Sequence, residues 1–183
     1  MCGGKRAPML LRGRLVRLRA IESSDFETWR SWINRPDVME GMDRAVIATA
    51  AQHKRYVETA VADDRAVFLA VETLEAERLS GIVWLWDVDH RHRRAEVRIV
   101  IGDPEARGRG FGTDALEALA TYAFGTLRLR KLYAYIHASN EASRRAFERA
   151  GFALEVTLER EAYRNGCETD VHRMRRFADE RHD

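Results

Sequence analysis

The chain has little cysteine, and no apolar run in it is long enough to cross a bilayer. Its two cysteines, Cys2 and Cys167, lie at opposite ends of the sequence, so they support neither a disulfide framework nor a cysteine-rich metal site. The opening residues 1–8 lack the apolar stretch of a secretory signal. We therefore expect free thiols, no metal, no membrane partner and a cytoplasmic location.

An excess of charge of one sign is also absent. Lys and Arg together number 31 against 29 for Asp and Glu, which gives a net charge of +2. Lysine itself is rare, and the one dense basic run is Arg91 to Arg94. A nucleic-acid interface needs basic residues spread over a surface, whereas one short run is typical of a solvated loop. We expect no specific nucleic acid partner.

The length of 183 residues and the apolar content of 45% allow one sizeable core. We expect residues 1–9 to be a disordered N-terminus, residues 10–178 to form a single domain and residues 179–183 to be a C-terminal tail. No repeat, low-complexity tract or internal linker interrupts that domain.

The first half of the chain contains strand and helix signals in alternation. Residues 12–20 alternate apolar and charged side chains, which predicts a first strand. A short helix is predicted from Ser24 to a point before Pro36, and a second from the Thr49–Gln52 capping-box pattern to about residue 62. Residues 66–71 and 79–88 are typical of an antiparallel hairpin, and residues 95–101 of a fourth strand.

The second half begins with apolar residues that recur every four positions over residues 111–127, which predicts a long amphipathic helix. A strand over residues 131–137 and a helix over residues 140–150 follow. Two final strands turn at Asn165 and Gly166. The order predicts an α/β (α+β) fold in which a mixed sheet has helices on its faces, with the chemistry where the sheet connectivity changes.

The segment from Gly102 to Thr113 leads from a strand through a glycine-rich turn into a helix. Glycines let the backbone approach a ligand closely and adopt a positive φ, and the free amides and dipole at a helix start favour an anion. The segment therefore indicates a phosphate-binding turn.

Three interpretations of this turn compete. A nucleoside triphosphate loop would need Lys followed by Ser or Thr after the last glycine, and the sequence lacks that pair. A dinucleotide fingerprint fits Gly110, Gly112 and Ala115, but the preceding strands look antiparallel and no acidic residue follows about 20 positions on. A purely structural turn is disfavoured, because alternating glycines at a helix start cost stability that packing alone does not require.

With Arg107, Gly110 and Gly112, the sequence resembles the GNAT superfamily of N-acetyltransferases, whose pyrophosphate signature is Gln or Arg, any two residues, Gly, any residue, and Gly or Ala. The resemblance is closest to the branch of ribosomal-protein N-terminal acetyltransferases and spermidine N-acetyltransferases. The stretches from His92 to Glu96 and from Asn140 to Phe152 carry the same likeness.

The resemblance implies a mostly antiparallel sheet of about seven strands, helices on both faces and a splayed central strand pair. It also implies acetyl-CoA as co-substrate, with its pantetheine arm on the backbone of Ile99, Val100 and Ile101. Asn140 and Ser143 would lie near that arm; the alternative for both is plain helix capping. The remaining residues implied to contact the coenzyme are Arg107, Gly108, Arg109, Gly110, Phe111, Gly112, Thr113 and Phe147.

Transfer to an amine needs a proton acceptor, help for the developing oxyanion and a proton for the leaving thiolate. A backbone amide of the fourth strand could serve the oxyanion. Glu96 is the candidate base, an ordinary strand-end charge being the alternative, with His90 and His92 as other bases. Many relatives place a tyrosine where this sequence has Phe147, which leaves Ser143, Tyr163 or water as proton donors.

The acceptor stays open among a polyamine, a protein N-terminus, an aminoglycoside and an amino sugar, and a homodimer stays open as the assembly. Carboxylates near the expected slot would attract a cationic amine, although scattered surface charge is the alternative; they are Asp37, Glu40, Asp43, Asp87 and Asp89. Two other functions also stay open: a noncatalytic acyl-CoA-binding or sensor module, and a nucleotide-dependent oxidoreductase.

Overall fold

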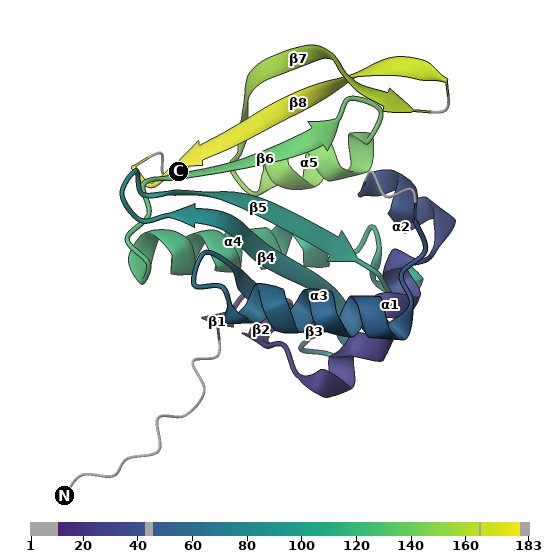
Figure 1. Cartoon of the computed structure of the whole chain (residues 1–183). Helices are drawn as coiled ribbons and strands as arrows, with labels where there is room; N and C mark the ends of the chain where they lie inside the picture. The colour runs from purple at the N-terminus through teal and green to yellow at the C-terminus, as the bar shows by residue number, and fades with distance from the viewer. Residues whose placement is uncertain (1–10, 43–45, 165, 180–183) are drawn as a thin grey trace, which may run out of the picture.

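The computed structural model describes residues 11–42, 46–164 and 166–179. Their strands form one eight-stranded sheet in the order β1-β2-β3-β4-β5-β6-β8-β7 (Figure 1). The expected disordered start at residues 1–9 lies outside the described residues, as do Asp43 and Asn165. Within the described part of the chain, no helix is long and apolar enough to cross a membrane.

The first expected strand is two strands, β1 (Leu11–Arg12) and β2 (Val16–Ala20), so the sheet has eight strands where about seven were expected. The break has a tertiary cause. The amides of Arg14, Leu15 and Val16 donate to the buried carboxylate of Asp114, at 2.9, 2.7 and 2.9 Å. These bonds hold residues 14–16 in the turn between the two antiparallel strands, which the Gly13 amide closes on the Val16 carbonyl at 2.8 Å.

The segment after β2 holds one helix more than expected. The 3₁₀ turn η1 (Ser23–Asp25) leads into α1 (Phe26–Ile33), which ends before Pro36 as predicted. Pro36 then begins the short helix α2 (Pro36–Gly41), because proline is well suited to the first helical position. The predicted capping box of Thr49 and Gln52 is present at the start of α3 (Ala50–Ala62).

The other elements follow the predicted order. The antiparallel strands β3 (Val67–Thr73), β4 (Leu79–Asp89) and β5 (Arg94–Ile101) lead through η2 (Pro104–Ala106) into α4 (Phe111–Gly125). They are followed by β6 (Lys131–His137), α5 (Glu141–Arg149) and the hairpin of β7 (Ala153–Arg164) and β8 (Cys167–Phe177).

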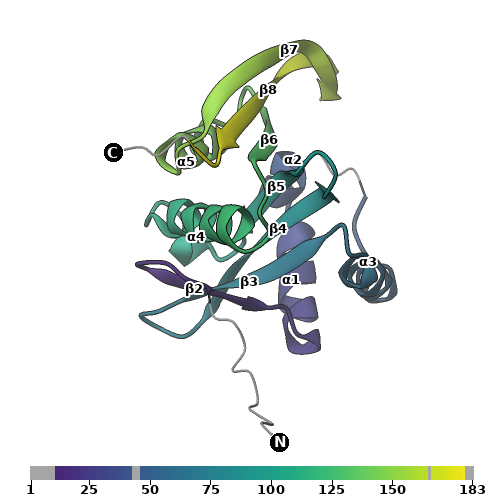
Figure 2. The same ribbon diagram turned by 90° about the vertical axis from the view of Figure 1, so that its left-hand side faces the viewer.

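Helices cover both faces of the sheet, as the resemblance implied. Figure 2 shows α4 and α5 on one side and α1 and α3 on the other. Aliphatic side chains with Phe111, Phe147 and Phe152 fill the side of α4 and α5, whereas the core on the α1 side is centred on Trp29, Phe68 and Trp84, which are in mutual contact. Val38 of α2 is buried in this aromatic cluster, which fixes the short helix beside the sheet.

The expected splay lies between β5 and β6. These strands are parallel and pair only where Arg94, Ala95 and Glu96 face Lys131, Leu132 and Tyr133. Beyond that point β5 continues to Ile101 with β4 as its neighbour on the opposite edge. The β6-facing backbone edge of residues 97–101 is therefore open. β5, α4 and β6 form one parallel strand-helix-strand unit, but β5 is flanked on its other edge by the antiparallel β4, whereas a dinucleotide-binding fold has a mostly parallel sheet.

Candidate active site

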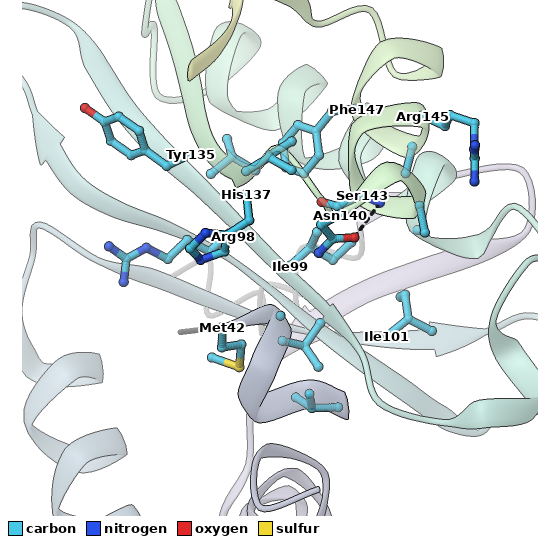
Figure 3. A pocket seen from close by; sticks show the side chains of 18 of the residues that line it. Met42, Arg98, Ile99, Ile101, Tyr135, His137, Asn140, Ser143, Arg145 and Phe147 are labelled. Carbon is cyan, nitrogen blue, oxygen red and sulfur yellow. Dashed lines mark hydrogen bonds between the residues drawn. The ribbon is translucent and has the colours of Figure 1, made fainter. Parts of the chain in front are cut away.

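A cleft of about 950 Å³ lies at the splay of β5 and β6. Its walls come from β5, the glycine-rich turn, the start of α5, the end of β6, α2 and the β7–β8 hairpin. Figure 3 shows Ile99 and Ile101 of β5 together with Asn140, Ser143 and Phe147 from the start and middle of α5, and Met42, the residue after α2, nearby. Most of the predicted site residues therefore line one cavity.

The open edge of β5 forms the floor of the cleft. The side chains of Ile99 and Ile101 pack toward the α4 core and that of Val100 into the aromatic cluster, so both layers hold the strand in place. A Cβ on Gly112 would lie 3.4 Å from Cγ1 of Ile101, which shows how closely α4 approaches this strand. The backbone amides and carbonyls of residues 97–101 are thus presented to the cleft by a rigid support.

The glycine-rich turn has the geometry of an anion site. Gly108 and Gly110 have φ values of 72° and 86°, a region in which a side chain is strained. Gly110 is the N-cap of α4, and that 15-residue helix directs its first amides and its dipole toward the turn. Gly108, Gly110, Gly112 and Thr113 all line the cleft.

The three large residues of the turn differ in where their side chains lie. Arg107 lines the cleft, where its Nε donates to the carbonyl of Ile101 at 3.0 Å. The Arg109 guanidinium instead bonds to Glu75 at 2.8 Å and lies 5.0 Å from the Phe111 ring centroid. Phe111 is buried in the α4 core. Neither Arg109 nor Phe111 lines the cleft, so their side chains do not reach a ligand there.

Asn140 and Ser143 line the cleft at the start of α5. The Asn140 carboxamide oxygen accepts from the Ser143 amide at 3.1 Å, as Figure 3 shows, so the expected capping bond is present. This bond does not involve the side-chain nitrogen Nδ2 of Asn140. That nitrogen lies 3.7 Å from the position that a Cβ on Gly41 would take. The α5 start and α2 therefore approach each other across the cleft.

Glu96 lines the cleft at the point where β5 and β6 separate. Its side chain is 12% exposed, and both carboxylate oxygens accept from Arg98, at 2.6 and 3.0 Å. Arg98 in turn lies over the Trp86 ring at 5.4 Å. Burial and the Glu96 charge together raise the pKa of Tyr133. Each Glu96 oxygen accepts one bond from Arg98, so each keeps a second lone pair that could accept an amine proton.

Sequence reasoning missed Arg98 and Tyr135. Residues two apart on a strand share a face, so the spacing of Glu96 and Arg98 was a usable signal for their pairing. Tyr135 lines the cleft and is 47% exposed, and its hydroxyl points away from Ser143 in Figure 3. No local pattern distinguishes it from an ordinary strand tyrosine.

Phe147 stands where many relatives have a tyrosine, and its ring belongs to the buried core. Phe147 is buried and packs edge-to-face with Phe152 at a centroid distance of 5.0 Å. Tyr163, an alternative proton donor, is 75% exposed and does not line the cleft. The alternative bases His90 and His92 lie in the β4–β5 turn, also outside the lining. Ser143 is the hydroxyl that stays beside the predicted coenzyme path.

The carboxylates expected to attract an amine are already paired with arginines. A hydrogen bond from Arg107, opposed by burial and reinforced by the charges of Arg107 and Arg35, lowers the pKa of Asp37. The other described carboxylates pair as follows: Glu40 with Arg164, Asp87 with Arg65, and Asp89 with Arg94. Asp43 lies outside the described residues. The pairing supports ordinary surface charge at these positions.

Metal ligation was tested within the described residues. There, no group of three or more His, Cys, Asp or Glu side chains is arranged to hold a metal ion.

Comparison with known proteins agrees with this geometry. The Acetyltransferase (GNAT) domain model matches residues 15–153. The spermidine N(1)-acetyltransferase of Escherichia coli K12 is 30% identical over 163 residues, which cover 87% of this chain and 84% of that protein. The putative ribosomal N-acetyltransferase YdaF of Bacillus subtilis is 29% identical over 161 residues, which cover 85% and 87%.

The crystal structure of spermidine N-acetyltransferase from Vibrio cholerae in complex with CoA and spermine superposes with a TM-score of 0.83 at 27% identity. The match covers 90% of this chain and 96% of that one. The family model spans most of the chain, and the sequence likeness to the E. coli enzyme covers 87% of it. The chain therefore belongs to the GNAT family of N-acetyltransferases, as its glycine-rich turn predicted.

Proposed function

We propose that this chain transfers the acetyl group of acetyl-CoA to the primary amine of a polyamine, with the coenzyme lying along the open edge of β5. One observation carries the donor part: the splay leaves residues 97–101 open beside a glycine-rich helix start. Extended backbone can pair with the amides of the pantetheine arm, and the amides of residues 107–113 can hold the pyrophosphate. Asn140, which lines the same cleft, would contact the same arm.

The reaction joins the amine nitrogen to the acetyl carbon and breaks the carbon–sulfur bond. A backbone amide of β5 stabilises the oxyanion that forms on the carbonyl oxygen. Glu96 takes the proton that the amine loses, directly or through water, on a lone pair that its bonds to Arg98 do not use. The departing thiolate receives a proton from Ser143 or from water, because Phe147 offers none.

The polyamine acceptor is supported by likeness and by the walls of the cleft. The relatives described above include a spermidine N(1)-acetyltransferase, and a structural neighbour was solved with CoA and spermine. On the α2 side the cleft is lined by Val38, Met42 and Trp84, which suit the methylene chain of a polyamine. A protein N-terminus is the second candidate, favoured by the likeness to the putative ribosomal N-acetyltransferase.

We also propose that the chain forms a homo-oligomer. A spermidine N-acetyltransferase of V. cholerae that matches with a TM-score of 0.75 and 26% identity was solved as a dodecamer. Here β7 is the outer strand of the sheet and exposes Leu154, Val156 and Tyr163. Light scattering on the purified protein distinguishes a monomer of 21.1 kDa from any assembly.

The test of function is thiol release from acetyl-CoA by the purified protein in the presence of single amines. Spermidine, a short peptide with a free N-terminus, an aminoglycoside and an amino sugar make up the panel. We expect spermidine to give the highest kcat/KM. A peptide that reacts best would move the acceptor to protein N-termini, and CoA binding with no thiol release from any amine would favour the noncatalytic sensor.

A further inference from the structure

Asp37 and Arg107 join the two sides of the cleft by an ion pair between residues 70 positions apart. Arg107 Nη1 donates to Asp37 Oδ2 at 2.5 Å, and the same oxygen accepts from Arg35 Nη2 at 3.0 Å. Both partners line the cleft, Asp37 from α2 and Arg107 from the glycine-rich turn. The first residue of the pyrophosphate signature is thus bonded to a carboxylate of the opposite wall.

The short helix α2 is held at both ends by ion pairs of this kind. At its start, Arg35 bonds to Asp37 and also donates to the Gly102 carbonyl at 3.1 Å. At its other end, Arg164 of β7 donates to the Glu40 carbonyl and pairs with its carboxylate at 3.9 Å. The helix therefore spans from the donor turn to the hairpin that forms another wall.

The Asp37–Arg107 pair is exposed enough to exchange partners. The Asp37 and Arg107 side chains are 43% and 39% exposed, and exposed ion pairs contribute little to stability. A pyrophosphate held on the amides of residues 107–113 would bring two negative charges to the arginine that Asp37 now occupies. Phosphate and carboxylate would then compete for one guanidinium, while Arg107 Nε stays on Ile101.

We propose that Asp37 is a positioning residue that holds the Arg107 guanidinium until the coenzyme pyrophosphate takes the place of the Asp37 carboxylate, so that coenzyme binding breaks the tie between Asp37 and the glycine-rich turn, while Arg35 still anchors the start of α2. This inference rests on the proposed function, since it takes the pyrophosphate to bind at the turn. Asp37 then acts on the donor through Arg107 rather than on the amine, which reassigns the carboxylate expected to attract the acceptor.

The test is calorimetric titration of the folded protein with CoA, paired with steady-state kinetics for acetyl-CoA. Replacing Asp37 by Asn removes the competing charge, so we expect Asp37→Asn to lower the Kd for CoA about two- to fivefold at low salt. The KM for acetyl-CoA should fall by a similar factor. Asp37→Glu keeps the negative charge, so its Kd and KM should equal those of the wild type. High salt removes most of the difference, because it screens exposed charges.

Two controls separate competition from a general effect of charge. Glu75 pairs with Arg109 of the same turn but neither residue lines the cleft, so Glu75→Gln should leave the Kd for CoA unchanged. In an Arg107→Gln background the Asp37→Asn change should have no further effect. Asp37→Ser serves as a second variant if Asp37→Asn is unstable.

An unchanged or higher Kd in a folded Asp37→Asn or Asp37→Ser protein would overturn the inference alone, provided that the wild type binds CoA. If Asp37→Asn lowered the Kd for CoA two- to fivefold in the Arg107→Gln background as well, the inference would also be overturned, because the effect would not pass through Arg107. A wild-type protein that does not bind CoA would instead contradict both this inference and the proposed function.

Discussion

The donor and acceptor sides of the cleft are built in different ways. The donor side comes from one continuous stretch, residues 96–113, with the start of α5 added. The acceptor side comes from α2, β4 and the β7–β8 hairpin, elements separated by much of the chain. A binding site made by a local stretch can be identified by a motif, whereas one assembled from distant segments has no motif of its own.

The two sides also differ in how they are held. The donor side rests on buried contacts, including the Asp114 carboxylate, which is 3% exposed and accepts from three backbone amides. The acceptor side is joined to its neighbours by partly exposed ion pairs of Asp37 and Glu40. Substitutions should therefore affect stability more on the donor side and substrate preference more on the acceptor side.

The largest effect is expected for Asp114→Ala at the start of α4. It leaves the amides of Arg14, Leu15 and Val16 without their acceptor, and we expect a loss of about 3 kcal/mol in the free energy of unfolding, measured with urea. Glu117→Ala is the matched control on the same helix, since its pair with Arg14 is exposed and worth less than about 0.5 kcal/mol. Equal losses in the two variants would remove the proposed contrast between buried and exposed anchors.

Glu96→Gln tests the chemistry where the two sides meet. It keeps the shape and removes the base, so we expect kcat to fall about a hundredfold with little change in the Kd for CoA. Activity recovers in part at high pH, where more of the amine is already unprotonated. Glu159→Gln, an exposed change on β7, is the control. Wild-type turnover of Glu96→Gln across the pH range would exclude the role.

The ion pairs of Asp25 and Glu72 with arginines of β2 predict how stability depends on pH. Burial alone would raise the pKa values of Asp25 and Glu72, but bonds from Arg19 to both and from Arg17 to Glu72 outweigh it and lower them. Carboxylates with lowered pKa values stabilise the fold above their unfolded pKa, and that contribution is lost as the pH falls through the folded value. We expect Asp25→Asn to cost about 2 kcal/mol at pH 7 and progressively less in acid, measured by urea unfolding. A cost that is independent of pH would contradict this.

Gly110→Val tests the donor turn directly. Its φ of 86° strains any side chain by about 1–2 kcal/mol, and a Cβ there would lie 3.5 Å from Cδ1 of Leu15, so valine should shift the turn whose amides would hold the pyrophosphate; we expect the Kd for CoA to rise about tenfold. Gly166→Val carries a similar strain at φ 82° in the β7–β8 turn and should leave the Kd unchanged. Unchanged affinity in folded Gly110→Val would mean that the turn does not hold the coenzyme.

The smallest effect is expected for Glu40→Gln on the acceptor side. Because Arg164 already pairs with this carboxylate, the KM for spermidine should change less than about threefold and should depend only weakly on salt. A tenfold rise in KM, removed by salt, would show that the carboxylate attracts the amine despite its partner.

Local patterns in the sequence were enough for most of the fold. The capping box at Thr49, the hairpin of β3 and β4 and the helix after Gly110 all depend on neighbours within a few residues. The sequence analysis does not predict the extra helix α2, because it uses Pro36 only as the end of the preceding helix, although proline also favours a helix start. The predicted domain limits, 10–178, and the individual roles of the site residues stay predictions.

The sequence by itself determined the donor turn, because the glycines that take a positive φ and the helix that begins beside them are adjacent in the chain. Only the tertiary structure decided which charges are engaged. Asp114 interrupts the first strand from about 100 residues away, and Arg107 finds Asp37 across 70 residues. Pairings at such separations depend on how the sheet and helices pack, and no local spacing in the sequence encodes them.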